Sequence, residues 1–143
     1  MVEMINFAEE AKSCFKFLSQ GHNFQCTSET PNRVRYESRD VFVEIYYGSR
    51  DGEVAIEFGR LNEKEKFSFT LFLRMVNPTL ERKMGNRIAW NIESLRRDLS
   101  ALANALRSEG LPIINNDDEV IDRMKDVRWW HFRPTALKEK FRK

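Results

Sequence analysis

One stretch, DVFVEIYYGSRDGEVAIEFGRL at residues 40–61, alternates apolar and polar residues on both sides of a central turn. Alternation with a period of two is typical of β-strands, because successive side chains of a strand point to opposite faces. The pair Asp51-Gly52 between the two runs is a strong hairpin signal. We therefore predict an antiparallel hairpin with one apolar face, formed by Val41, Val43, Ile45, Val54, Ile56 and Phe58.

The polar face of this hairpin carries two carboxylates, Glu44 and Glu57. A two-residue turn at Asp51-Gly52 would place Tyr46 opposite Glu57, whereas a longer turn would place Glu44 there. Because directly opposed like charges are unfavourable, we expect the first register. Arginines of the preceding strand, such as Arg35, would then pair with the glutamates and keep both ionised. This argues against an acid/base pair, so we expect no catalytic residue here; a polar binding surface is the alternative to a solvated face.

The segments around the hairpin extend it into a sheet. A helix is predicted over residues 6–21, capped by Asn6 and ended by Gly21. Short links between successive strands favour an antiparallel meander. The further strands that we predict lie near residues 24–28, 33–38 and 66–76, which gives a sheet of four or five strands.

After Asn77-Pro78 the apolar spacing changes from strand-like to helical. A long helix is predicted over residues 87–110, with Asn86 as a possible cap and Gly110 as its end. The same spacing could form a coiled-coil seam between two copies, but we expect the stripe to pack on the protein's own sheet. The stripe consists of Ile88, Ile92, Leu95, Leu99, Leu102 and Leu106.

A last helix is predicted from the acidic run NNDDE at residues 115–119, which suits the positive end of a helix. Pro134 interrupts its pattern and leaves residues 135–143 as a short helix or a tail. The apolar stripe of this helix would contain Val120, Met124, Val127 and His131. We therefore predict a single α+β domain over residues 1–143, with the C-terminal helices on one face of the sheet.

Composition limits the function classes. The 143-residue chain has a formal net charge of +2, which is too small to indicate a polyanion partner by itself. The two cysteines and two histidines match no metal or redox spacing, so we expect reduced cysteines, no metal and no cofactor. No apolar run approaches the ~18 residues of a membrane span, and no signal peptide is recognised, which favours a cytoplasmic protein without a membrane partner.

The segment VRWWHFRP at residues 127–134 combines aromatic and basic residues. Two adjacent Trp residues of a helix point about 100 degrees apart, so they do not enter one core together. One Trp could cover the core beside a solubilising basic tail; otherwise the segment could bind a protein or stack on nucleic acid. The candidate binding residues are Arg128, Trp129, Trp130 and Arg133, together with Arg35 and Tyr46 on the sheet.

The run VRYESRDVFVEIYYGSRDGEVAIEFGRL, within residues 5–75, resembles a pattern in small uncharacterised bacterial α+β proteins with an immunity-protein-like layout. Such proteins have an N-terminal helix, a sheet and C-terminal helices, and some are similar to immunity proteins, which act by binding. The resemblance implies a binding role. We expect a non-enzymatic protein-interaction module, monomeric or weakly homodimeric, whose partner is another protein. A nucleic-acid-binding protein is the first alternative, and an enzyme of unrecognised type the second.

Overall fold

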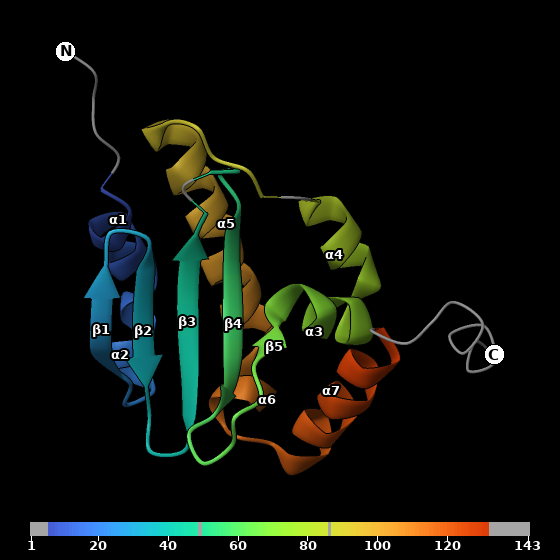
Figure 1. The fold of residues 1–143 in the computed structure, drawn as a ribbon. Helices are drawn as coiled ribbons and strands as arrows, with labels where there is room; N and C mark the ends of the chain where they lie inside the picture. Colours follow the sequence, from blue (N-terminus) through green and yellow to red (C-terminus); the bar gives the residue numbers. More distant parts are fainter. Residues whose placement is uncertain (1–5, 49, 86, 132–143) are drawn as a thin grey trace.

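A five-stranded antiparallel sheet in the order β1-β2-β3-β4-β5 forms the centre of the fold (Figure 1). The computed structural model describes residues 6–48, 50–85 and 87–131, with side chains through residue 126. Helices precede and follow the sheet, which confirms the predicted α+β class and the meander. The strands are β1 (Gln25–Thr30), β2 (Arg33–Glu37), β3 (Val41–Tyr47), β4 (Val54–Arg60) and β5 (Phe67–Ser68).

The helices form two groups around this sheet. In Figure 1, α1, α2 and α5 lie behind the strands, whereas α3, α4 and α7 lie beside the β4–β5 edge. The face of the sheet turned toward the viewer carries no helix over β2 and β3. The helices are α1 (Phe7–Cys14), α2 (Lys16–Gly21), α3 (Phe69–Val76), α4 (Pro78–Met84), α5 (Ile92–Glu109), α6 (Leu111–Ile114) and α7 (Asp118–His131).

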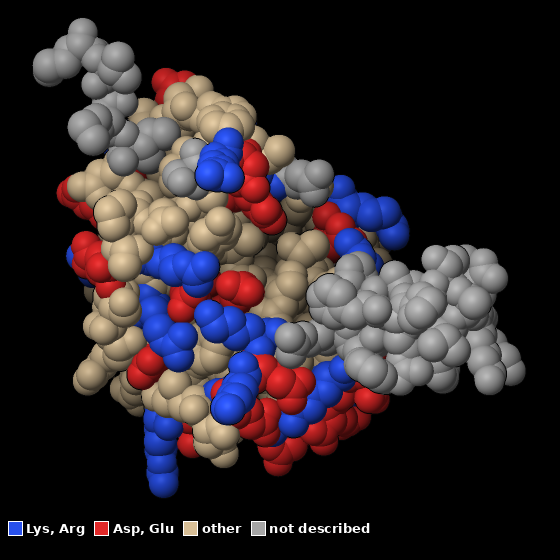
Figure 2. Space-filling view, in the orientation of Figure 1, with Lys and Arg blue, Asp and Glu red and all other residues tan. Residues whose placement is uncertain are grey.

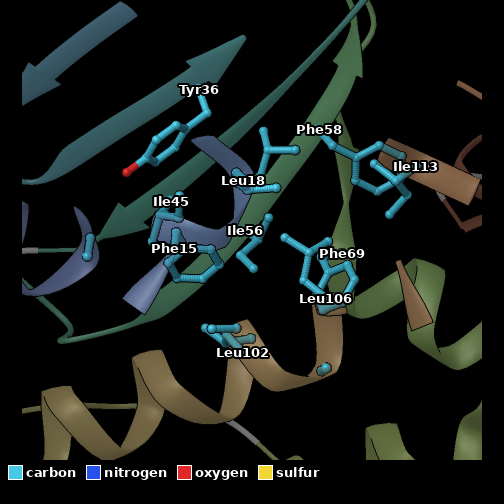
Figure 3. Close-up of a cluster of buried hydrophobic side chains, with 14 of the residues drawn as sticks. Phe15, Leu18, Tyr36, Ile45, Ile56, Phe58, Phe69, Leu102, Leu106 and Ile113 are labelled. Atoms are coloured by element: carbon cyan, nitrogen blue, oxygen red, sulfur yellow. The ribbon is translucent and has the colours of Figure 1, made fainter. Parts of the chain in front are cut away.

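The core lies between the sheet and the helices behind it. All six residues of the predicted apolar face are buried, which confirms the face assignment of the hairpin. Figure 3 shows Leu102 and Leu106 of α5 directed at Ile56 and Phe69. Leu95 and the rest of the leucine stripe are buried too. Each such side chain contributes about 1.5–3 kcal/mol on burial, so the stripe packs within the chain's own core, as expected.

The N-terminal helix is capped as predicted but is divided in two. The Asn6 Oδ1 accepts a hydrogen bond from the Glu9 backbone N–H at 3.2 Å. The helix is interrupted at Phe15, whose backbone leaves helical geometry (φ −102°, ψ 15°), and it ends at Gly21. Phe7 and Ala11 of α1 and Leu18 of α2 are buried, as is Phe15 at the interruption, so both halves contribute to the core.

The predicted strand over residues 66–76 is wrong beyond its first residues. Only Phe67 and Ser68 pair with β4, and the chain then enters α3. The Ser68 hydroxyl caps this helix by accepting from the Leu71 N–H. Phe69 and Phe72 are buried at helical spacing, so this run satisfies periods of two and of 3.6 at once, and the cap decides between them.

Two helix starts also differ from the prediction. Asn77 caps a short helix, α4, with Pro78 in its first turn; no helix was predicted there. The long helix begins at Ile92 rather than near residue 87, because the Asn91 side chain accepts from the Ser94 N–H and forms a capping box. The predicted cap, Asn86, lies outside the described residues. Ile88 is therefore not part of the helical stripe, and it is 45% exposed.

α7 is held to the sheet through polar contacts. The Asp117 side chain accepts from the Val120 N–H and caps the helix. Arg60 at the end of β4 pairs with Asp118, and Lys125 pairs with Glu63 at 3.1 Å. Met124 of the predicted stripe is buried and Val120 is half-buried, whereas the side chains of Val127 and His131 lie outside the described part.

The edge strand β1 is exposed along its whole length. Its pairing with β2 shifts register between Cys26 and Ser28, which is a β-bulge. Glu29 pairs with Lys12 of α1 at 2.8 Å, so it directs a charge toward the helical side of the sheet. A bulge and an inward charge are devices that discourage a further strand from adding to an edge.

Among the described residues, no helix combines the length and the hydrophobicity that a membrane span requires.

Candidate functional site

The polar face of the sheet is centred on Glu44, and its register differs from the prediction. Glu44 lies directly opposite Glu57, and Tyr46 lies opposite Ala55. The predicted pairing of Tyr46 with Glu57 is therefore wrong. The difference is two residues, which leaves every side chain on its predicted face.

The register follows from the way the hairpin ends. The Gly48 N–H donates to the Glu53 carbonyl at 2.8 Å, which leaves a four-residue turn instead of a two-residue one. Gly52 has a positive φ of 70° in this turn, a conformation that favours glycine. Its carbonyl accepts from the Ala89 N–H, and the Val54 N–H donates to the Arg87 carbonyl, both at 2.8 Å. Segment 87–89 therefore pairs with the edge of the hairpin that faces away from β3, next to the turn.

Three cations surround the Glu44 carboxylate and compensate for the facing glutamate. Arg35 Nη1 donates to Oε2 at 3.1 Å, Arg33 donates to Oε1, and the Lys66 ammonium lies 3.6 Å from Oε1. Glu44 is only 5% exposed. This arrangement explains how the chain tolerates two opposed glutamates at the centre of its sheet.

These contacts determine the protonation of Glu44. Burial alone would raise the pKa of the Glu44 carboxyl, but the hydrogen bond from Arg35 and the charges of Lys66 and Arg33 outweigh it, and the pKa is lowered. Glu44 is therefore an ionised partner in a salt-bridge network. A general acid would require the opposite shift.

Aromatic rings lie beneath the arginines of this face. The Arg35 guanidinium lies 4.0 Å from the centre of the Phe42 ring, and that of Arg33 lies 4.9 Å from the centre of the Tyr46 ring. Phe42 is buried although it is on the polar face, because Gly59 beside it leaves room for the ring: a Cβ on Gly59 would be 2.8 Å from Phe42. Stacked arginine and tyrosine side chains are a common composition of protein-binding surfaces.

A cleft of about 310 Å³ adjoins the sheet face at Ala55, the residue opposite Tyr46. Figure 2 shows it as a hollow between the strands and the helices α3 and α4, beside the patch of blue and red side chains over the sheet. Thr70 and Arg74, predicted as sheet residues, line the cleft from α3 instead. Its lining is formed by Asp51, Glu53, Val54, Ala55, Thr70, Leu73, Arg74, Glu81, Met84, Gly85, Arg87, Ile88 and Leu102.

Two large apolar side chains, one in the cleft wall and one near it in sequence, are exposed. Ile88 lines it, and Trp90, two residues on, is 63% exposed. The indole ring lies against the hairpin turn, since a Cβ on Gly52 would be 3.1 Å from its Cε2 atom. Ala89 lies between Ile88 and Trp90. Its carbonyl accepts a hydrogen bond from the Tyr47 hydroxyl at 2.9 Å, which holds this part of the backbone in place. An exposed Trp on a fixed backbone is the kind of residue that dominates protein interfaces.

The sequence-predicted binding residues are divided by the fold. Arg35 and Tyr46 lie together on the sheet face that adjoins the cleft. The backbone positions of Arg128, Trp129 and Trp130 belong to α7, but their side chains lie outside the described part, and Arg133 lies outside the described residues altogether.

Sequence reasoning missed Ile88 and Trp90. Ile88 was assigned to the helical stripe. Trp90 would fall on the opposite side of that helix from Ile88 and Ile92, and a Trp away from the apolar stripe was the signal that could have identified it.

Within residues 6–48, 50–85 and 87–126, no group of three or more His, Cys, Asp and Glu side chains is arranged to hold a metal ion. Cys14 and Cys26 are free thiols. Comparisons with protein-family models, curated proteins and solved structures give no match. The resemblance to immunity-protein-like bacterial proteins stays a prediction.

Proposed function

We propose that this chain is a non-enzymatic protein-interaction module. It binds its partner through one continuous surface, formed by the open sheet face around Arg35 and Tyr46 and by the adjoining cleft with Ile88 and Trp90. The single observation that carries this proposal is that one cleft is lined both by the exposed Ile88, two residues before the exposed Trp90, and by Ala55, which lies opposite Tyr46 of a cation–aromatic stack.

The chemistry of the surface supports binding rather than catalysis. The buried carboxylate at its centre, Glu44, is neutralised by Arg33, Arg35 and Lys66, and its pKa is lowered. These side chains are held in fixed positions by one another, which reduces the conformational entropy that binding would cost. A rigid polar area beside a cleft that combines aliphatic and charged side chains is consistent with the mixed composition of protein–protein interfaces.

The test begins with affinity capture from cells that make this chain naturally, and continues with the purified candidate partner. Binding is then measured by isothermal titration calorimetry for the wild-type chain and for Trp90→Ala and Tyr46→Ala. Interface residues of this type cost about 2 kcal/mol or more on truncation, so we expect affinity to fall roughly 30-fold for Trp90→Ala and by a smaller factor for Tyr46→Ala.

Leu111→Ala is the matched control. Leu111 is 47% exposed, but it lies on α6, outside the cleft. It should leave affinity unchanged. If the partner binds both sheet-side variants as tightly as it binds wild type, the proposed surface is wrong; if no purified protein binds the chain, the proposed function is wrong.

A further inference from the structure

We propose that the cleft receives a lysine or arginine side chain of the partner, with the carboxylates of Asp51 and Glu53 as counter-charges. This inference rests on the proposed function and specifies the chemistry of the partner. It is based on the ion pairs around the cleft, in which Asp51 and Glu53 take no part among the described residues.

The cations that line the cleft already have partners. Arg74 Nε donates to Glu81 at 2.8 Å on one wall. Arg87 Nη1 donates to Asp98 at 3.2 Å on the other, and its second amino group donates to the Met84 carbonyl. Both arginines are therefore bonded to groups of the protein itself, and neither is paired with Asp51 or Glu53.

Asp51 and Glu53 are exposed at the cleft, and within the described part of the chain neither forms an ion pair. Arg50 is exposed in the same turn, but it does not line the cleft and has no ion-pair partner among the described residues. Two unpaired carboxylates in the wall of the cleft favour a positively charged occupant, because a negative one would meet like charge, and the described cations that line the cleft, Arg74 and Arg87, are already paired.

The apolar lining suits the rest of a basic side chain. Val54, Leu73 and Met84 offer aliphatic contacts for the methylene stem of a lysine or arginine, which packs on apolar surface while its charged end stays near water. The exposed Trp90 ring beside the cleft offers a face on which a guanidinium can stack. A cationic side chain with apolar neighbours therefore matches both the charges and the lining.

The test is a titration of the full-length ¹⁵N-labelled chain with capped pentapeptides of the form Gly-Leu-X-Leu-Gly. Binding is measured from the NMR chemical shifts of the backbone amides. X is arginine, lysine, citrulline or glutamate; citrulline keeps the shape of arginine without its charge. We expect saturable shifts at the amides of Val54, Ile88 and Trp90 with arginine and lysine, at least tenfold weaker binding with citrulline, and weaker binding still with glutamate.

The variant Asp51→Asn/Glu53→Gln should weaken binding of the arginine peptide about tenfold. The asparagine side chain retains the oxygen that accepts from the Glu53 backbone N–H at 3.0 Å in the wild-type chain, so the turn keeps its support. The matched control is Glu119→Gln/Asp122→Asn, which makes the same charge change at exposed positions of α7 and should leave binding unchanged.

Three results would overturn the inference: equal affinity for the arginine and citrulline peptides, saturable shifts centred on Glu44 instead of the cleft, or no saturable shift with any peptide. The proposed function is judged separately, by the partner protein and the Trp90→Ala variant. A partner that is lost with Trp90→Ala but retained by Asp51→Asn/Glu53→Gln would preserve the function and refute the basic occupant.

Discussion

Replacing Glu44 by glutamine should destabilise the fold, because it removes a buried carboxylate that three cations share. The side chain is nearly isosteric, so the change isolates the charge. Arg33, Arg35 and Lys66 would then face each other across the sheet with Glu37 and Glu57 as the remaining nearby carboxylates of the face.

The magnitude follows from the exposure of the partners. A hydrogen bond to a charged group contributes about 1.5–3 kcal/mol, and Glu44 accepts two from arginines. The side chains of Arg33 and Arg35 are 43% and 25% exposed, so both regain water when the carboxylate is lost, and the cost falls below that of a fully buried pair. We therefore expect a loss of about 2 kcal/mol in the free energy of unfolding.

The measurement is urea unfolding followed by circular dichroism at neutral pH. With a slope of about 2 kcal/mol/M, a loss of this size lowers the midpoint by roughly 1 M. Glu57→Gln is the matched control, because it makes the same substitution at the residue directly opposite. Removing that charge relieves repulsion, so we expect its midpoint to stay within about 0.3 M of wild type or to rise. Equal losses for the two variants would refute the network as a source of stability.

The pH dependence gives a second check. The folded pKa of Glu44 is lowered, so its contribution is complete above the unfolded value of about 4.3 and is lost as pH falls through the folded value. As the pH falls below about 4, the free energy of unfolding of the wild-type protein should therefore approach that of Glu44→Gln. A difference between the two proteins that stays constant from neutral pH into acid would show that Glu44 has the same pKa in both states.

Two further predictions concern the packing of the sheet and the C-terminal segment. Gly59→Ala should cost about 1–3 kcal/mol in urea unfolding, because its Cβ would be 2.5 Å from the Glu65 carbonyl oxygen and 2.8 Å from Phe42; Gly21→Ala, where a Cβ meets nothing within 4 Å, should stay within about 0.5 kcal/mol. If the chain binds nucleic acid through its basic C-terminal segment, the affinity should fall steeply with salt and be lost when the residues after Asp126 are removed. Fluorescence anisotropy with single-stranded oligonucleotides measures both effects. Binding that does not depend on salt, or no binding, would refute this alternative.

The faces of the central hairpin were predictable from sequence, whereas its register was not. Strand alternation assigns each residue to a face without reference to any partner, and the buried set from Val41 to Phe58 follows it. The repulsion argument for the register considered Glu44 and Glu57 alone. Lys66, from the loop before β5, contributes to the compensation, and segment 87–89 fixes the turn; both are distant in sequence from the hairpin tip.

The run from Phe67 to Val76 was mispredicted for a different reason. Its apolar residues satisfy both periodicities, and the outcome depends on Ser68, which can end a strand or cap a helix. The presence of Phe72 at a position that a strand would direct to the polar face was a local indication of the helix.

The candidate surface could be predicted only in part. Arg35 and Tyr46 were identified because strand alternation placed them on a polar face. The cleft depends on how α3, α4 and segment 87–88 meet the hairpin. Trp90, two residues beyond this segment, was counted as helical because the stripe of isoleucines begins before the true helix start at Ile92.

The bulge and the inward Glu29 in β1 also affect how copies of this chain meet one another. Amyloid-like ribbons grow when straight strands stack in register through unsatisfied main-chain groups. The bulge bends the edge strand β1, and the charge of Glu29 lies on its helical side, so that a further strand cannot stack on it in register. Concentrated solutions of the protein should therefore remain free of fibrils, and a variant that straightens this border would be the one to form them.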